Sequence, residues 1–169
     1  ACMAWAGLGQ QILALTSSHF CAAERQFRTP LSYGAVRTPT AQWTATAAGC
    51  CLLQPQGEGV GIAAATFGRV QDYQVRDINN MGAAMAPAAA STLLHYFADT
   101  HTEPQEFDCI YTGDLGQVGS SLLRELLAAE GLLVKNHVDC GCILFDAAEQ
   151  QVKSGGSGPG CCAAVLCGH

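Results

Sequence analysis

One segment near the middle of the chain limits the fold more than any other. It starts with β-prone residues at 107–112, passes through a glycine-rich turn with one acid at 113–116, and enters an apolar helical run. A strand that leads through a glycine turn into a helix is a building unit of open α/β sheets, and ligands gather at such turns because turn backbone and helix N-termini offer unpaired N–H groups. A second glycine-rich turn follows at 155–160. The sequence therefore predicts an α/β fold with two candidate binding turns.

Apolar patterns predict the remaining elements. We expect a buried strand at 12–16 that opens into a long loop, a hairpin of two strands at 44–53 and 60–70, helices at 83–98 and around 122–127, a strand at 142–145, and a helix at 161–167 that is buried on all sides. Helices that alternate with strands indicate a mainly parallel, layered sheet. No strand follows the last helix to cover it, so we expect a partial chain.

Charge and hydropathy argue against two classes of partner. The net charge is -6, and the eight Lys and Arg residues form no cluster of the kind that phosphate binding needs. No apolar run reaches the roughly 18 residues of a membrane span. We therefore expect no nucleic-acid partner and no transmembrane segment.

The ten cysteines could suggest a zinc site or a disulfide scaffold. Their spacing favours neither, because Cys50 and Cys51 are adjacent, as are Cys161 and Cys162, and no Cys-x-x-Cys pair occurs. Most lie in apolar runs, where a reduced cysteine behaves as a small core residue. We expect buried free thiols in a reducing compartment.

Several long motifs then resemble one family. They stand at residues 16–20, 23–28, 39–44, 79–89, 112–116, 139–141 and 155–158. In this order and spacing the chain, from about Ile12 to His169, resembles the stage V sporulation protein AD family of spore-forming Firmicutes. The resemblance implies a thiolase-like layered fold (αβαβα), here as one partial domain over 1–169. In that fold, residues from about 1 to 70 would form the end of the first half, and residues 71–169 would form most of the second half. The resemblance also implies a homodimer for the protein at full length.

The resemblance also implies a function. The family binds dipicolinic acid, alone or with calcium, during uptake into the developing spore, together with other stage V sporulation proteins at the membrane. The expected location is the forespore or spore, at the inner spore membrane through those partners. A flat pyridine dicarboxylate needs a slot with convergent N–H and O–H donors, which glycine turns supply without side-chain bulk.

Seven residues are the predicted ligand-binding set: Ser18, His19, Asn80, Asp114, Gly156, Ser157 and Gly158. His19 could instead cap a strand end, and Asn80 could simply cap the alanine-rich helix. The carboxylate of Asp114 would have to be distant from the ligand carboxylates, protonated, or joined to them through a shared cation. It would orient the pocket or contact a bound calcium ion, which prefers oxygen ligands.

The alternative from another class is an acyl-transfer enzyme of the thiolase or ketoacyl synthase type, with a cysteine nucleophile activated by histidine. In condensing relatives the strand corresponding to 109–111 ends in a catalytic histidine, whereas this chain has Thr112, Gly113 and Asp114 there. We therefore expect a binding protein with no catalytic residue, no metal site and no resident cofactor. A purely structural partner in a membrane uptake complex is a third alternative.

Overall fold

The computed structural model describes residues 2–20 and 37–168 and has mixed helices and strands, as predicted for the α/β class. The elements in chain order are α1 (Cys2–Trp5), β1 (Ile12–Ser18), β2 (Trp43–Thr44), β3 (Ala47–Leu53), α3 (Met81–Thr100), the 3-10 helix η2 (Pro104–Glu106), β4 (Ile110–Thr112), α4 (Gly116–Ala129), β5 (His137–Asp139), α5 (Cys140–Ile143), α6 (Ala147–Gln150), β6 (Gly156–Ser157) and α7 (Pro159–Gly168). Most of the long loop expected after the first strand, residues 21–36, lies outside the described residues. The division into two thiolase-like halves stays a prediction.

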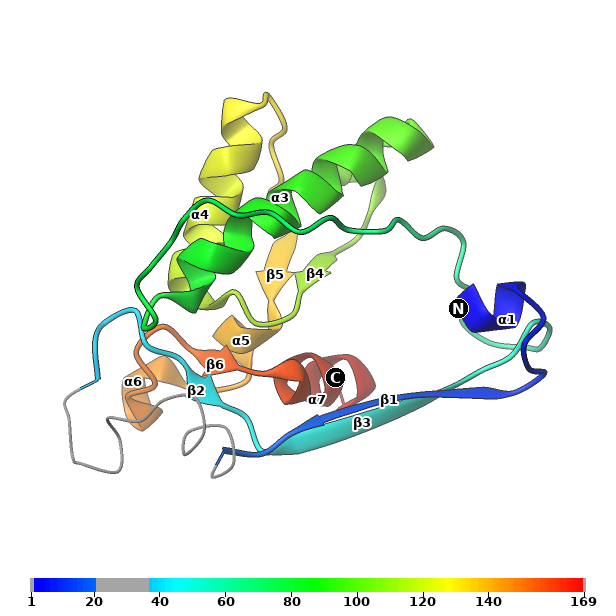
Figure 1. Cartoon of the computed structure of the whole chain (residues 1–169), viewed down its shortest axis with the longest axis horizontal. Coiled ribbons are helices and arrows are strands. Elements are labelled where there is room, and N and C mark those ends of the chain that lie inside the picture. The colour runs from blue at the N-terminus through cyan, green and yellow to red at the C-terminus, as the bar shows by residue number, and fades with distance from the viewer. Residues whose placement is uncertain (1, 21–36, 169) are drawn as a thin grey trace.

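The strands form three pairs among the described residues. β4 and β5 are parallel, β2 and β6 are parallel, and β1 and β3 are antiparallel. In Figure 1, helices α3 and α4 lie beside the β4–β5 pair, the β1–β3 ribbon lies at the opposite side with α7 against it, and β2–β6 lies between. Two of the three pairs are thus parallel, but the pairs form separate two-stranded sheets rather than one sheet, so the expected layered sheet stays a prediction.

The two helices around the first glycine turn are confirmed. Helix α3 begins after Asn80, so Pro87 lies in its second turn, and α4 ends just before Gly131, whose φ of 81° is that of a helix-terminating glycine. Leu123 and Leu127 are fully buried on one face of α4. They belong to the main core with residues of α3 and β4, namely Ala86, Ala90, Phe97 and Ile110. This core fixes the strand and helix on either side of the first turn.

The predicted hairpin at 44–53 and 60–70 is wrong. Strand β3 pairs with β1 instead, with Ile12 opposite Leu53 and Ser18 opposite Ala47. Residues 60–70 run as extended chain outside any strand and leave the side chains of Val60 and Val70 exposed. The apolar composition was therefore a poor guide here, because the hydrogen-bonding edge of β3 is taken by a strand far earlier in the sequence.

The predicted strand at 142–145 is also wrong. The strand in this region is β5, which begins five residues earlier, and the chain turns at Cys140 into the short helix α5, where Leu144 N donates to Cys140 O at 3.1 Å. Strand β5 ends before the predicted strand begins because its pairing with β4 extends only from His137 to Asp139. The charged turn expected after it is the short helix α6, capped by Asp146.

Two predictions of burial need correction. Strand β1 exists, but Leu13 and Leu15 are 62% and 72% exposed, because α7 is the only described helix in extensive contact with the β1–β3 ribbon. The middle of helix α7 is buried, with Gly160, Cys161, Ala163 and Val165, whereas its last residues are exposed, including Leu166 at 55%. The cysteines divide similarly: Cys140 and Cys161 are buried, whereas four are exposed, namely Cys2, Cys50, Cys51 and Cys167.

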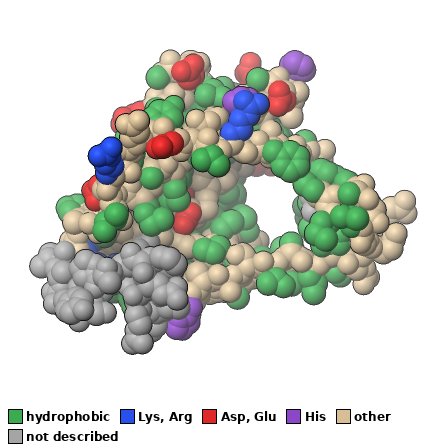
Figure 2. Space-filling model, viewed as in Figure 1, with side chains coloured by type: hydrophobic (Ala, Val, Ile, Leu, Met, Phe, Trp, Pro, Cys, Tyr) green, Lys and Arg blue, Asp and Glu red, His purple; other side chains and the backbone are tan. Residues whose placement is uncertain are grey.

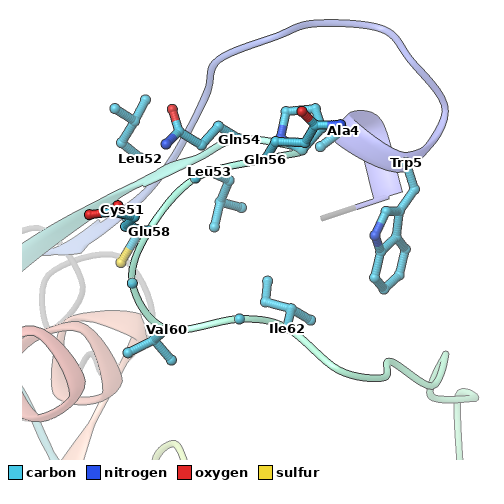
Figure 3. Close-up of a pocket in the computed structure, with 14 residues that line it drawn as sticks. Ala4, Trp5, Cys51, Leu52, Leu53, Gln54, Gln56, Glu58, Val60 and Ile62 are labelled. Atoms are coloured by element: carbon cyan, nitrogen blue, oxygen red, sulfur yellow. The ribbon is translucent and has the colours of Figure 1, made fainter.

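Figure 2 shows where the molecule is hollowed: an opening separates the helical side from the far end of the β1–β3 ribbon. At that end a pocket of about 650 Å³ lies between the end of β3, residues 54–62, and Ala4 and Trp5 of α1. Figure 3 shows its lining, which is mostly apolar and backbone, with Trp5 and Ile62 on one side and Cys51 at the edge of β3.

Candidate functional site

The first glycine turn, residues 112–116, is held by the carboxylate of Asp139. The parallel register of β4 and β5 places Thr112 beside Asp139. One carboxylate oxygen accepts hydrogen bonds from Thr112 Oγ1 at 2.6 Å and Leu115 N at 2.9 Å, and the other accepts one from Gly116 N at 2.9 Å. Asp139 is only 3% exposed, so these three donors compensate for the burial of its charge. Sequence reasoning placed Asp139 only in a motif and missed this role.

The first backbone amides of helix α4 also donate hydrogen bonds to groups of the protein itself. Gln117 N donates to Ser154 O at 2.7 Å, and Val118 N donates to Ser154 Oγ at 3.2 Å. Together with the two amides bound to Asp139, four successive N–H groups therefore have acceptors inside the protein. The expectation that this turn offers unpaired N–H groups is wrong for residues 115–118, because a buried acid and a buried serine already occupy them.

His137 extends the same network. Its Nε2 lies 2.8 Å from Thr112 Oγ1, and because that hydroxyl gives its proton to Asp139, Nε2 is the donor and the ring carries its proton there. The other ring nitrogen, Nδ1, is buried with no hydrogen-bond partner. Burial is the main cause that lowers the pKa of His137, against the opposing effect of the Asp139 charge. The imidazole is therefore neutral and structural near pH 7, a role that the sequence did not indicate.

The second glycine turn, residues 155–160, is built onto strand β2 and contacts several predicted residues. Ala45 N donates to Ser157 O at 2.9 Å beside the β2–β6 pair. Gly158 N donates to Asp114 Oδ2 at 2.7 Å. Gly160 N donates to Ser18 Oγ at 2.9 Å, and that hydroxyl donates in turn to Ala45 O at 2.6 Å. The structure therefore brings Ser18, Asp114 and the second turn together, and their part in ligand binding stays a prediction.

Gln42 ties the two turns to each other. Its Nε2 donates to the carbonyl oxygens of Asp114 and Gly156, each at 2.7 Å. The side chain is 3% exposed, and no spacing rule marks a single glutamine before a short strand as a link of this kind. Asp114 is thus joined to the second turn directly, through its carboxylate on Gly158 N, and indirectly, through its carbonyl on Gln42.

Two further predicted residues lie at the edge of this arrangement or apart from it. His19 is exposed and lines, with Ser17, Ser18 and Thr46, a pocket of about 390 Å³ next to the second turn. Asn80 caps helix α3, since its Oδ1 accepts a hydrogen bond from Ala83 N at 3.1 Å. That contact agrees with the capping alternative for Asn80, and its part in ligand binding stays a prediction.

The buried thiols near the turns are poorly suited to act as nucleophiles. Cys161 Sγ donates to Ser157 O at 3.2 Å, and Cys140 starts helix α5. Burial raises the pKa of each thiol to about 12. A reactive cysteine needs the opposite shift, because the thiolate is the nucleophile. The described residues also contain no group of three or more His, Cys, Asp or Glu side chains that could hold a metal ion.

Comparison with known proteins identifies the family. The family model described as Stage V sporulation protein AD (SpoVAD) matches residues 1–169. The chain belongs to the stage V sporulation protein AD family. Stage V sporulation protein AD of Bacillus subtilis (strain 168) is 41% identical over 164 residues, which are 96% of this chain and 48% of that relative. The chain thus spans about half the length of the relative, and membership in the family makes it a sporulation protein.

Several motifs that carried the resemblance build the two turns. Residues 112–116 and 139–141 form the first turn with its carboxylate anchor, and residues 39–44 and 155–158 form the second turn with Gln42. None of the helices within 2–20 and 37–168 is long and apolar enough to cross a bilayer.

Proposed function

We propose that this protein binds dipicolinic acid, alone or as its calcium chelate, for uptake into the developing spore. One observation carries the proposal: a carboxylate, that of Asp114, already lies on the Gly158 amide of the second turn at 2.7 Å. A site that holds one carboxylate in this way offers the donor that a carboxylate ligand requires. Family membership supplies the setting, since the chain is a sporulation protein.

The contacts suggest how the ligand would be accommodated. A carboxylate of dipicolinate takes the place of Asp114 on Gly158 N. The Ser18 hydroxyl next to Gly160, which donates to Ala45 O in the free protein, turns to donate to the ligand at the same end of the turn. Ser17, His19 and Thr46 line the adjoining pocket and face the remainder of the ligand. Calcium, when it arrives with the ligand, lets Asp114 remain close, because the cation neutralises the repulsion between carboxylates.

The same geometry argues for binding rather than acyl transfer. Acyl transfer needs a thiolate and a neighbouring general base. Here the two buried thiols beside the turns have a pKa raised to about 12, and His137 is bound to Thr112 rather than to a cysteine. The proposal therefore includes no enzymatic activity and no resident cofactor. Turnover of an acyl thioester by the purified protein would favour the enzyme instead.

The cellular setting is part of the proposal. The protein would act at the inner spore membrane through other stage V sporulation proteins and would be a homodimer at its natural length. A purely structural role in such a complex is the second candidate, because the amides of both turns are engaged by groups of the protein itself. That role needs no small ligand.

Calorimetric titration of dipicolinic acid, with and without calcium, into the protein at its natural length tests the proposal. Ser18→Ala should weaken binding by roughly fivefold to tenfold, as expected for one lost hydrogen bond of about 1 kcal/mol. Asp114→Asn should shift the preference toward free dipicolinate by about tenfold, because it removes a competing charge and a calcium ligand.

Asp108→Asn, an exposed acid at the other end of β4, is the matched control and should change neither affinity. Absence of saturable binding in the unmodified protein would favour the structural role. Affinities of both forms that are untouched by Asp114→Asn would show that Asp114 has no part in the site.

A further inference from the structure

Helix α7 follows strand β3 through a stripe of small residues. A Cβ added to Gly160 would lie 3.3 Å from Ala47 Cβ, and one added to Gly49 would lie 2.8 Å from Ala163 Cβ and 3.1 Å from Cys167 Sγ. Residues 47, 49 and 51 share one face of the strand, and positions 160, 163 and 167 share one face of the helix. The two elements therefore run side by side in the same direction, and their next contact joins Cys51 and Cys167.

These two thiols are in direct contact and accessible. Their sulfur atoms are 3.8 Å apart, and both residues are exposed. Cys51 also lines the pocket of about 650 Å³ at the end of β3, which gives a small molecule a path to its sulfur (Figure 3). Cys50 is equally exposed, but the alternation of side chains along a strand directs it to the opposite face.

We propose that Cys51 and Cys167 form an oxidisable dithiol that a hydroperoxide converts into a disulfide joining β3 to α7. One thiolate attacks a peroxide oxygen, the O–O bond breaks, and a sulfenic acid and water form. The second sulfur then attacks the sulfenic sulfur, the S–O bond breaks, and a second water leaves as the S–S bond forms. Two thiols lose two electrons and two protons, and hydrogen peroxide is reduced to two waters.

The geometry requires little rearrangement. A disulfide has an S–S distance of about 2.05 Å, so the sulfurs must approach by a little under 2 Å, which rotation of two exposed side chains can supply. Gly49 and Ala163 already hold the backbones close next to the pair. The hydrogen bond with Cys167 is the main cause that raises the pKa of Cys51, which lowers the thiolate share of that residue, so oxidation should be slow near pH 7 and accelerate with increasing pH.

The inference is independent of the dipicolinate site and is tested without that ligand. The reduced protein at its natural length is treated with hydrogen peroxide, blocked with N-ethylmaleimide and digested with trypsin. Cys50 and Cys51 lie in one tryptic peptide, 38–69, and Cys167 lies in the peptide that begins at Ser154 together with Cys161 and Cys162. Single variants are therefore needed to assign the bond.

We expect a crosslink between these two peptides that a reducing agent reverses, that raises the melting temperature, and that disappears in Cys51→Ser and in Cys167→Ser. Cys50→Ser, the matched control on the other face of β3, should leave it intact. A crosslink that survives Cys51→Ser, or oxidation that leaves both peptides unlinked, would overturn the inference.

Discussion

The two glycine turns have similar compositions and are closed in different ways. The first turn is held by Asp139, a carboxylate that is 3% exposed and accepts hydrogen bonds from three donors. The second turn is held by the half-buried Asp114, whose carboxylate accepts a hydrogen bond from Gly158 N, and by the Ser18 hydroxyl. The first anchor lies inside the protein, whereas the second borders a pocket.

This difference separates a structural turn from a turn that can exchange partners. Displacing Asp139 would leave a buried charge and several buried amides without partners, which costs several kcal/mol. Displacing Asp114 should cost less, because this residue is only half-buried, and under the proposed function a ligand carboxylate would replace it on Gly158. A glycine-rich turn after a strand is therefore insufficient by itself to indicate a ligand site. The burial of the group that accepts hydrogen bonds from the turn amides decides whether a ligand can replace that group.

The largest expected effect is from Asp139→Ala. Loss of the buried carboxylate leaves Thr112 Oγ1 and the amides of Leu115 and Gly116 without their acceptor, so the free energy of unfolding should fall by about 3–5 kcal/mol. Urea unfolding of the protein at its natural length measures it. Asp108→Ala, which removes an exposed acid, should change stability by less than about 0.5 kcal/mol. Equal losses in the two variants would contradict a structural role for the first turn.

Gln42→Glu should have the next largest effect. In the unmodified protein, Gln42 Nε2 lies 2.7 Å from the carbonyl oxygens of Asp114 and of Gly156. The substitution replaces this nitrogen with a carboxylate oxygen, which the two carbonyl oxygens repel. We expect a loss of about 2–3 kcal/mol in unfolding free energy, from one buried unsatisfied charge. Gln56→Glu, on an exposed loop, serves as the control and should be neutral. A stable Gln42→Glu protein would mean that the turns do not depend on this link.

Alanine substitution of one glycine in each turn compares their rigidity. Gly116 has φ 68°, and an added Cβ would lie 2.4 Å from the backbone oxygen of Ser154. Gly158 has φ 88°, and the nearest atom to its added Cβ is the side-chain Ser18 Oγ at 3.0 Å. Gly116→Ala should therefore cost about 2–4 kcal/mol, and Gly158→Ala about 1–2 kcal/mol.

Gly131→Ala, with φ 81° and open space around it, isolates the backbone cost of about 1 kcal/mol and is the control for both turns. Thermal unfolding of the three variants checks the order. A larger loss of unfolding free energy in Gly158→Ala than in Gly116→Ala would contradict the account, because it would make the second turn the more rigid of the two.

The smallest effect is a pH dependence that arises from His137. Burial lowers its pKa in the folded protein below the ordinary value of 6.5, so the unfolded chain binds the proton more readily. Stability from this residue is complete above about pH 6.5 and is lost as the pH falls through the range below it. Urea unfolding at pH 7.5 and 5.5 should show a smaller loss in His137→Gln than in the unmodified protein, while His95→Gln, on the exposed side of α3, should behave like the unmodified protein.

The sequence predicted those elements whose signals are local. The alanine-rich run predicted helix α3, and the leucine pairs predicted α4. The sequence did not predict the strands whose bounds and partners depend on long-range pairing. Strand β3 pairs with β1 rather than with residues 60–70, and β5 ends at Asp139 because β4 ends opposite it. Gln42 and Asp139 were missed as anchors because their partners lie 23–114 positions away.

The central claim is that the second turn accepts the ligand and the first does not. Hydrogen exchange of the protein at its natural length, followed in peptides covering 112–118 and 154–161, with and without dipicolinate and calcium, tests it most directly. The account predicts that the ligand changes protection of 154–161, where the Gly158 and Gly160 amides lie, and leaves 112–118 unchanged. A change confined to 112–118, or none in either peptide at a saturating ligand concentration, would contradict it.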